Sequence, residues 1–194
     1  MERAARSTRG TEQRAVILVE GESDRVALEA VASRLGRDLT TEGISVVAMD
    51  GAMNIGRFLD ELGPRGLGVV CAGLYDVAEE PHVRRGLERA GFGSEPARTD
   101  PERMGFFACV EDLEDELIRA LGADAVLEIV RQRGELRAFR SLTKQPEWRG
   151  RPVEHQLRRF LGNASRKFRY APLLVEALDL SAIPRPLVQV LAHV

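Results

Sequence analysis

Long apolar runs are missing from this sequence. No stretch approaches the ~18 consecutive apolar residues that a membrane-spanning helix needs, and the first residues lack the apolar segment of a secretion signal. We therefore expect a cytoplasmic protein with no membrane partner. With 194 residues, the chain has room for one main domain and an appendage.

Cysteine and histidine are also scarce. The two cysteines, Cys71 and Cys109, each lie inside an apolar stretch, and the three histidines are isolated from them and from one another. A disulfide framework or a zinc site needs more ligands at closer spacing. The pattern argues against both and predicts two buried thiols.

Lysine is the rarest charged residue, and charge is divided unevenly along the chain although the net charge is only -2. Residues 131–169 hold twelve Lys or Arg and three acids, whereas the remainder holds 16 basic and 27 acidic residues. An acidic site beside a basic surface suits a metal-assisted reaction on a polyanion. A solvated helical face would give the same counts, so charge alone leaves both interpretations open.

Apolar periodicity divides the chain into three parts. Residues 1–13 are polar and basic without an apolar period, which predicts a flexible arm. Between 14 and 110, β-branched runs alternate with helical patterns, as is typical of a mostly parallel sheet with helices on both faces. We expect a Rossmann-like α/β domain with strands at 15–20, 44–49, 67–74 and 104–110 and intervening helices at 23–35, 55–62 and 82–90.

Only helical patterns remain after residue 110. Glycines and prolines separate five apolar periodic segments, which predicts an all-helical C-terminal region at 111–194 that packs on the sheet. The expected helices are 113–121, 123–133, 153–161, 167–178 and 186–192.

Acidic residues follow the first three predicted strands. Glu20, Asp50 and Asp76 each come at or directly after a strand end, and Asp24 lies one helical turn after Glu20. The carboxyl ends of parallel strands share one edge of a sheet, where ligands bind, and gathered carboxylates select Mg²⁺ or Mn²⁺. Each acid alone also fits a turn or the start of a helix. Glu20 favours the metal site, because a turn does not require Glu after a buried strand.

A known family motif coincides with these acids. Residues 16–24, Val-Ile-Leu-Val-Glu-Gly-Glu-Ser-Asp, resemble the opening motif of Toprim domains, and the Glu-Gly-x-x-Asp form resembles that of the overcoming-lysogenization-defect (OLD) nucleases. The Gly-rich turn at 51–54 and the Leu-Tyr-Asp segment at 74–76 fit the same pattern. The resemblance covers roughly 14–110, with Asp112-Leu113-Glu114 and Lys167 as later points of similarity.

The resemblance implies a metal-dependent endonuclease or nickase that acts on DNA, less readily on RNA, with one or two Mg²⁺ or Mn²⁺ ions. Glu20 would be the general base or a metal ligand, Asp24 and Asp76 would hold an ion, and Lys167 would stabilise charge on a phosphate. Candidates for a second ion are Glu79, Glu80, Asp112 and Glu114. Asp112 fits the cap of a helix equally well.

Basic and aromatic residues of the C-terminal region are candidates for contacts with nucleic acid. Arginines would follow the phosphate backbone without sequence preference, and Trp148 and Phe168 would stack on bases or pack in the core. The arginines in question are Arg149, Arg151, Arg158, Arg159, Arg166 and Arg169.

Two departures from the OLD pattern leave alternatives open. The family's Asp-x-Asp begins at Asp76, but Ala78 occupies the second position, so the domain could instead be a catalytically weakened module that binds nucleic acid or regulates a partner. The sequence also lacks a G-x-x-x-x-G-K-[ST] loop, so we expect an ATPase, if used, to be a separate partner. A phosphoacceptor domain of the receiver type, centred on Asp76, is a third interpretation.

Overall fold

The computed structural model describes residues 13–92 and 100–194. Its centre is a four-stranded sheet in the order β2-β1-β3-β4, in which every neighbouring pair is parallel. The predicted fold class is confirmed, whereas residues 1–12 of the predicted arm 1–13 and part of the loop before the fourth strand fall outside the described residues. The strands are β1 Ala15–Val19, β2 Ile44–Ala48, β3 Val70–Asp76 and β4 Phe106–Cys109.

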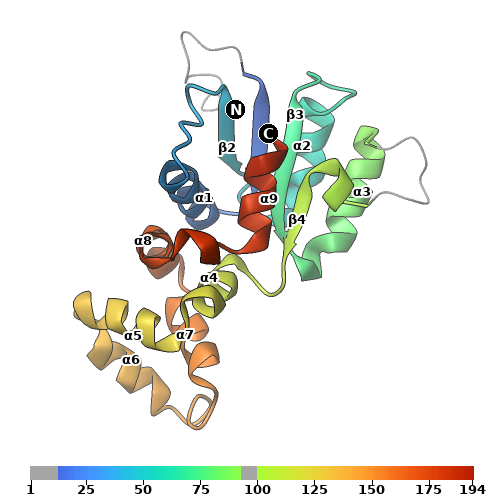
Figure 1. The fold of residues 1–194 in the computed structure, drawn as a ribbon. Coiled ribbons are helices and arrows are strands. Elements are labelled where there is room, and N and C mark those ends of the chain that lie inside the picture. Colours follow the sequence, from blue (N-terminus) through green and yellow to red (C-terminus); the bar gives the residue numbers. More distant parts are fainter. Residues whose placement is uncertain (1–12, 93–99) are drawn as a thin grey trace.

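Helices cover both faces of the sheet (Figure 1). Every residue of β1 is buried because the strand is central, and its side chains alternate between two hydrophobic cores. Val16 and Leu18 pack with α2 Ile55–Leu62 and α3 Glu80–Ala90. Ile17 and Val19 face the other core, which is formed with α1 Glu22–Arg34, α8 Ala164–Ala177 and α9 Arg185–His193.

The remaining helices form a lobe beyond the carboxyl edge of the sheet, drawn in yellow and orange in Figure 1. This lobe contains a helix, α6, that the sequence analysis did not predict, although Leu136, Phe139 and Leu142 recur there at a spacing of three residues. Phe139 anchors α6 by an edge-to-face contact with Phe160, with 5.5 Å between ring centroids. The helices are α4 Leu113–Leu121, α5 Ala123–Gln132, α6 Leu136–Thr143 and α7 Val153–Leu161.

Strand boundaries differ from the predictions most at β3. The expected strand at 67–74 begins three residues later and continues to Asp76, because Leu67 lies in an exposed turn. A short 3₁₀ turn, η2 Val77–Glu79, then leads into α3. Cys71 and Cys109 are buried in β3 and β4 as free thiols, as predicted. In the part of the chain that the structure describes, no helix is long and apolar enough to cross a membrane.

Candidate active site

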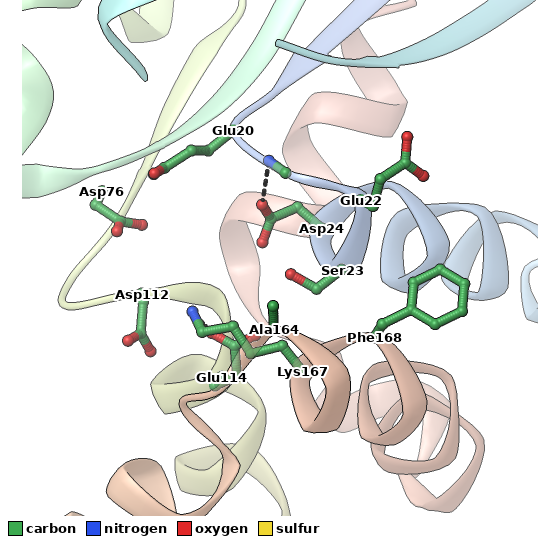
Figure 2. A pocket seen from close by; sticks show the side chains of 11 residues that line it. Glu20, Glu22, Ser23, Asp24, Asp76, Asp112, Glu114, Ala164, Lys167 and Phe168 are labelled. Atoms are coloured by element: carbon green, nitrogen blue, oxygen red, sulfur yellow. Dashed lines mark hydrogen bonds and ion pairs between the residues drawn. The ribbon is translucent and has the colours of Figure 1, made fainter. Parts of the chain in front are cut away.

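A pocket of about 290 Å³ lies at the carboxyl edge of the sheet, between β1, β3, α1, α4 and α8. Figure 2 shows that its acidic side chains other than Glu22, together with one lysine, turn toward a common space. The structure thus brings together six of the residues singled out in the sequence, from segments almost 150 positions apart. They are Glu20, Asp24, Asp76, Asp112, Glu114 and Lys167.

The turn from β1 into α1 places the first two acids. Glu20 follows the last residue of β1 and is exposed, whereas Asp24 sits in the first helical turn and is half-buried. Its Oδ2 accepts a 2.8 Å hydrogen bond from the Gly21 N–H, which satisfies one free donor at the start of the helix. Burial, followed by the nearby charge of Glu114, raises the pKa of Asp24 to about 6.

Asp76 ends β3, the neighbour of β1 in the sheet. Burial raises its pKa to about 7, and the charges of Glu20, Asp112 and Asp24 add to this effect. Like charges favour the protonated form of a carboxyl group when they lie close together. The raised pKa of Asp76 therefore reflects its burial first and the like charges of the neighbouring acids second.

Glu114 and Lys167 form an ion pair across the floor of the pocket, with 2.6 Å between Oε2 and Nζ. Glu114 is only 3% exposed, and burial is the main cause of its raised pKa. Burial opposes the charge on Lys167, but Glu114, Asp112 and Asp24 outweigh it and raise the lysine pKa. The other oxygen of Glu114, Oε1, is buried without a hydrogen-bond partner among the described residues.

Asp112 both caps a helix and lines the pocket. It caps α4, since its Oδ1 accepts a 2.8 Å hydrogen bond from the Asp115 N–H. Its Oδ2 accepts a 2.8 Å hydrogen bond from Arg158 Nε, and its side chain also lines the pocket. Capping and pocket formation are therefore compatible at this residue.

Three other predicted acids lie away from the pocket. Glu79 and Glu80 are in the 3₁₀ turn and the first turn of α3, where Glu80 pairs with Arg84 at 2.6 Å and Glu79 lies 3.8 Å from His82. Asp50 is in the turn after β2, with a backbone φ of 58°. The structure does not bring these carboxylates to the other acids.

Several of the predicted nucleic-acid-binding arginines instead make contacts within the protein. Arg158 pairs with Glu111 and Asp112, while Arg166 and Arg169 both pair with Glu135. Arg159 lies over the ring of Trp148, 6.0 Å from its centroid. Arg149 and Arg151 are exposed in the turn before α7, where each donates a hydrogen bond to a backbone carbonyl.

Sequence reasoning missed Ser23, which lines the pocket between Glu20 and Asp24. Its place inside the Glu-Gly-x-x-Asp motif was the available signal. Phe168, named earlier for stacking or core packing, is 49% exposed and stands at the pocket wall beside Lys167. Its exposure agrees with the first of those two expectations better than with the second.

The pocket offers oxygen ligands of the kind that Mg²⁺ and Mn²⁺ prefer. Within residues 13–92 and 100–194, however, no group of three or more acidic, cysteine or histidine side chains is arranged so that it could hold a metal ion. The acids surround one space, but their side chains do not converge on a single point.

Comparison with known proteins shows which families have a similar sequence and fold. A family model described as "Overcoming lysogenization defect protein-like, TOPRIM domain" matches residues 13–77. The C-terminal region of the Xanthomonas campestris pv. campestris OLD protein is 29% identical in one solved structure, with a TM-score of 0.66 over 93% of this chain and 94% of that chain. In a second structure of that region the identity is 26% and the TM-score 0.69, over 93% of this chain and 91% of that chain.

The C-terminal region of the Burkholderia pseudomallei OLD protein shares the fold, with a TM-score of 0.70 and 23% identity over 93% of this chain and 96% of that chain. A search of curated proteins found no match. The matches favour the Toprim interpretation over the receiver-like one. Residues 13–77 thus match the model of an OLD-like Toprim domain, and the chain as a whole is similar to the C-terminal regions of OLD proteins.

Proposed function

We propose that this protein is a Mg²⁺- or Mn²⁺-dependent endonuclease or nickase that cleaves DNA phosphodiester bonds at the acidic pocket. The observation that carries the proposal is that five of the six carboxylates lining the pocket, all except Glu22, lie with one lysine around one space, although they come from two strand ends and three helices. A purely structural role does not require so many like charges in one place, since each raises the free energy of the others.

The residues of the pocket fit a divalent cation in their chemistry. Glu114 Oε1 is a buried oxygen with no hydrogen-bond partner among the described residues, and such an atom is costly unless a ligand satisfies it. The ligands would come from Glu20, Asp24 and Asp76, with Asp112 and Glu114 available to a second ion. A bound cation would neutralise these acids and polarise a phosphoryl oxygen of the substrate.

The side chains suggest a division of work. Glu20 is the exposed member of the five acids, so it can reach an attacking water and accept its proton, or bind the ion directly. Lys167, positioned by Glu114, would donate hydrogen bonds to a non-bridging phosphate oxygen as negative charge develops there. The water oxygen forms the new bond to phosphorus while the bond to the leaving oxygen breaks.

Phe168 extends the site toward the bases of a substrate. An exposed aromatic ring at the pocket wall can stack on an unpaired base whatever its identity. This favours a nucleic acid over a small phosphate ester, and DNA is the form that the OLD resemblance implies. A separate ATPase remains a proposed partner on the same ground.

A plasmid-nicking assay tests the proposal directly. With Mg²⁺ or Mn²⁺, the unmodified protein should convert supercoiled plasmid to nicked or linear DNA, and EDTA should stop the reaction. Glu20→Gln and Asp76→Asn should each reduce the rate by about 100-fold or more, because each removes a charge that the chemistry uses. Glu128→Gln is the matched control, since Glu128 is exposed on α5 and pairs with Arg131 on its own helix.

Retained nicking in both pocket variants would refute the proposal. One specific observation keeps a second function in view: Ala78 stands where the resembled motif has an aspartate, and the neighbouring Glu79 and Glu80 do not line the pocket. An unmodified protein that binds DNA but does not nick it would identify a catalytically weakened module that binds nucleic acid or regulates a partner.

A further inference from the structure

A second hollow, of about 430 Å³, lies outside the acidic pocket and shares no lining residue with it. It lies between the 3₁₀ turn η1 Ala52–Asn54, the start of α2 and the outer side of α3. We call it the arginine hollow, because its charged lining consists of Arg57, His82, Arg85 and Arg89. No acidic residue lines it among those that the structure describes.

Two glycines shape the arginine hollow by letting α2 and α3 approach closely. A Cβ atom on Gly56 would lie 2.6 Å from Arg89 Nη2, and one on Gly86 would lie 3.4 Å from the Cα of Gly56. Arg89 therefore lies directly against the α2 backbone, where Asp60 pairs with it at 2.6 Å. The guanidinium is positioned before any ligand arrives, so less conformational entropy is lost on binding.

The other two arginines of the hollow have no carboxylate partner that neutralises their charge, as Asp60 does for Arg89. Neither Arg57 nor Arg85 forms an ion pair with a carboxylate within the described residues. Arg57 lies over the ring of Phe58, 5.1 Å from its centroid, and Arg85 Nη2 is 2.9 Å from His82 Nδ1. The predicted basic residues Arg158, Arg166 and Arg169, by contrast, are paired with acids. Positive charge that no carboxylate neutralises is therefore found in this hollow, as it also is at the exposed Arg149 and Arg151 before α7.

The position of the arginine hollow relates it to the acidic pocket. Helices α2 and α3 begin just after β2 and β3, so their first turns, with Arg57 and His82, lie toward the same carboxyl edge of the sheet as Glu20 and Asp76 (Figure 1). Arg85 and Arg89 follow in the next two turns of α3. A polyanion lying along this edge can meet both sites, and arginine is well suited to bind its phosphates. An extended chain of phosphates fits two separate sites better than a single small anion does.

We propose that the arginine hollow binds backbone phosphates of the nucleic-acid substrate and thereby holds the strand beside the acidic pocket. This inference rests on the proposed function for its choice of ligand. The contact is electrostatic and independent of sequence, so it contributes affinity and register and leaves base selection to other residues.

DNA binding without turnover tests this proposal. Fluorescence anisotropy of labelled single-stranded and duplex oligonucleotides, in Ca²⁺ and in EDTA, gives the affinity over a series of salt concentrations. Arg57→Gln combined with Arg85→Gln should weaken binding about tenfold at low salt and reduce the slope of log K against log salt by about 2. Both side chains are exposed, so the substitutions should leave the fold intact.

The matched control removes two exposed arginines that line neither the acidic pocket nor the arginine hollow. Arg103 and Arg185 are 82% and 68% exposed, and they lie just before β4 and at the start of α9. Arg103→Gln combined with Arg185→Gln makes the same change in net charge, and DNA affinity should stay close to that of the unmodified protein. Equal losses in both double variants would show that net charge alone determines binding and would overturn the proposal.

The remaining outcomes separate the arginine hollow from the nuclease. If the Arg57 and Arg85 double variant kept the affinity and the salt slope of the unmodified protein, the proposed role of the arginine hollow would be wrong. The nicking result would be unaffected. If DNA binding depended on the arginine hollow but the unmodified protein nicked no plasmid, the phosphate-binding role of the hollow would be supported and the nuclease function would be refuted. If that variant bound DNA normally but lost binding of pyrophosphate, the ligand would be a small phosphate compound and the nucleic-acid assignment would be wrong.

Discussion

At the residue scale, Ala78 is the clearest difference between this chain and the motif that it resembles. It lies two positions after Asp76, in the 3₁₀ turn η2, and its side chain is exposed. An aspartate at this position would meet no packing restraint. A substitution at this position can therefore test whether the acids of the pocket suffice for metal-dependent chemistry.

We expect Ala78→Asp to increase nicking at limiting Mn²⁺, because a further carboxylate near the end of β3 should strengthen ion binding. Plasmid nicking over a series of Mn²⁺ concentrations would measure this as a lower metal concentration at half-maximal rate. Ala78→Asn is the control, since it has the same shape without the charge. An equal response of both variants would show that an ion does not use this position.

At the element scale, Glu135 connects α8 to the junction between α5 and α6. It accepts hydrogen bonds from Arg166, Arg169 and the Tyr170 hydroxyl, and its side chain is 18% exposed. Burial by itself would raise the pKa of Glu135, but the two arginines outweigh it and hold the pKa below its usual value of 4.5. The ionised form therefore stabilises the folded state.

Glu135→Gln should lower the free energy of unfolding by about 1 kcal/mol at pH 7, where the carboxylate is charged in both states. A lowered folded-state pKa gives stability that is present above pH 4.5 and is lost as the pH falls through the folded-state value. The difference between variant and unmodified protein should therefore shrink below about pH 4.5. Urea denaturation at several pH values would measure it, and a constant difference would contradict this explanation.

The element scale also shows what local sequence can and cannot predict. Helices 55–62, 113–121 and 153–161 have the predicted bounds, because apolar period and Gly or Pro boundaries coincide there. The helix α6 was missed despite the apolar residues Leu136, Phe139 and Leu142, and Phe139 is the one side chain that it buries. Its stability depends on Phe160, a contact that no local pattern contains.

At the scale of the whole molecule, the C-terminal helices complete the core of the sheet. Helix α9 packs on β3 and β4, and its Leu187, Val190 and Leu191 are almost fully buried in the core that also contains Ile17. The last helix along the chain therefore covers strands that precede it by roughly 80 to 120 residues. Its packing should contribute to the stability of the whole sheet.

Leu187→Ala should destabilise the protein by about 2–5 kcal/mol, because it removes a fully buried side chain and leaves a cavity. The neighbouring Val188 is 41% exposed, and Val188→Ala should change stability by no more than about 0.5 kcal/mol. Thermal unfolding followed by circular dichroism would compare them. If α9 and the sheet share one core, Leu187→Ala shifts a single transition, and separate transitions would contradict a shared core.

The proximity of two pocket acids could be predicted because topology alone brings them together. Glu20 directly follows β1 and Asp76 ends β3, and these strands are parallel neighbours in the sheet. The internal pairing of Arg158 with Asp112 could not be inferred, because it depends on how α7 packs against α4. The arginine hollow was missed for the same reason, since its arginines come from two helices and form no motif.

The pairing of Glu114 with Lys167 bears on any attempt to transplant this site. The segment matched by the family model, 13–77, supplies Glu20, Asp24 and Asp76, while Asp112, Glu114 and Lys167 come from beyond it. A chimera carrying only the matched segment would therefore contain Glu20, Asp24 and Asp76 but lack Lys167, the positive charge on the other side of the pocket. Recipient scaffolds would have to provide two further helices at the same angle before the grafted carboxylates regained their surroundings.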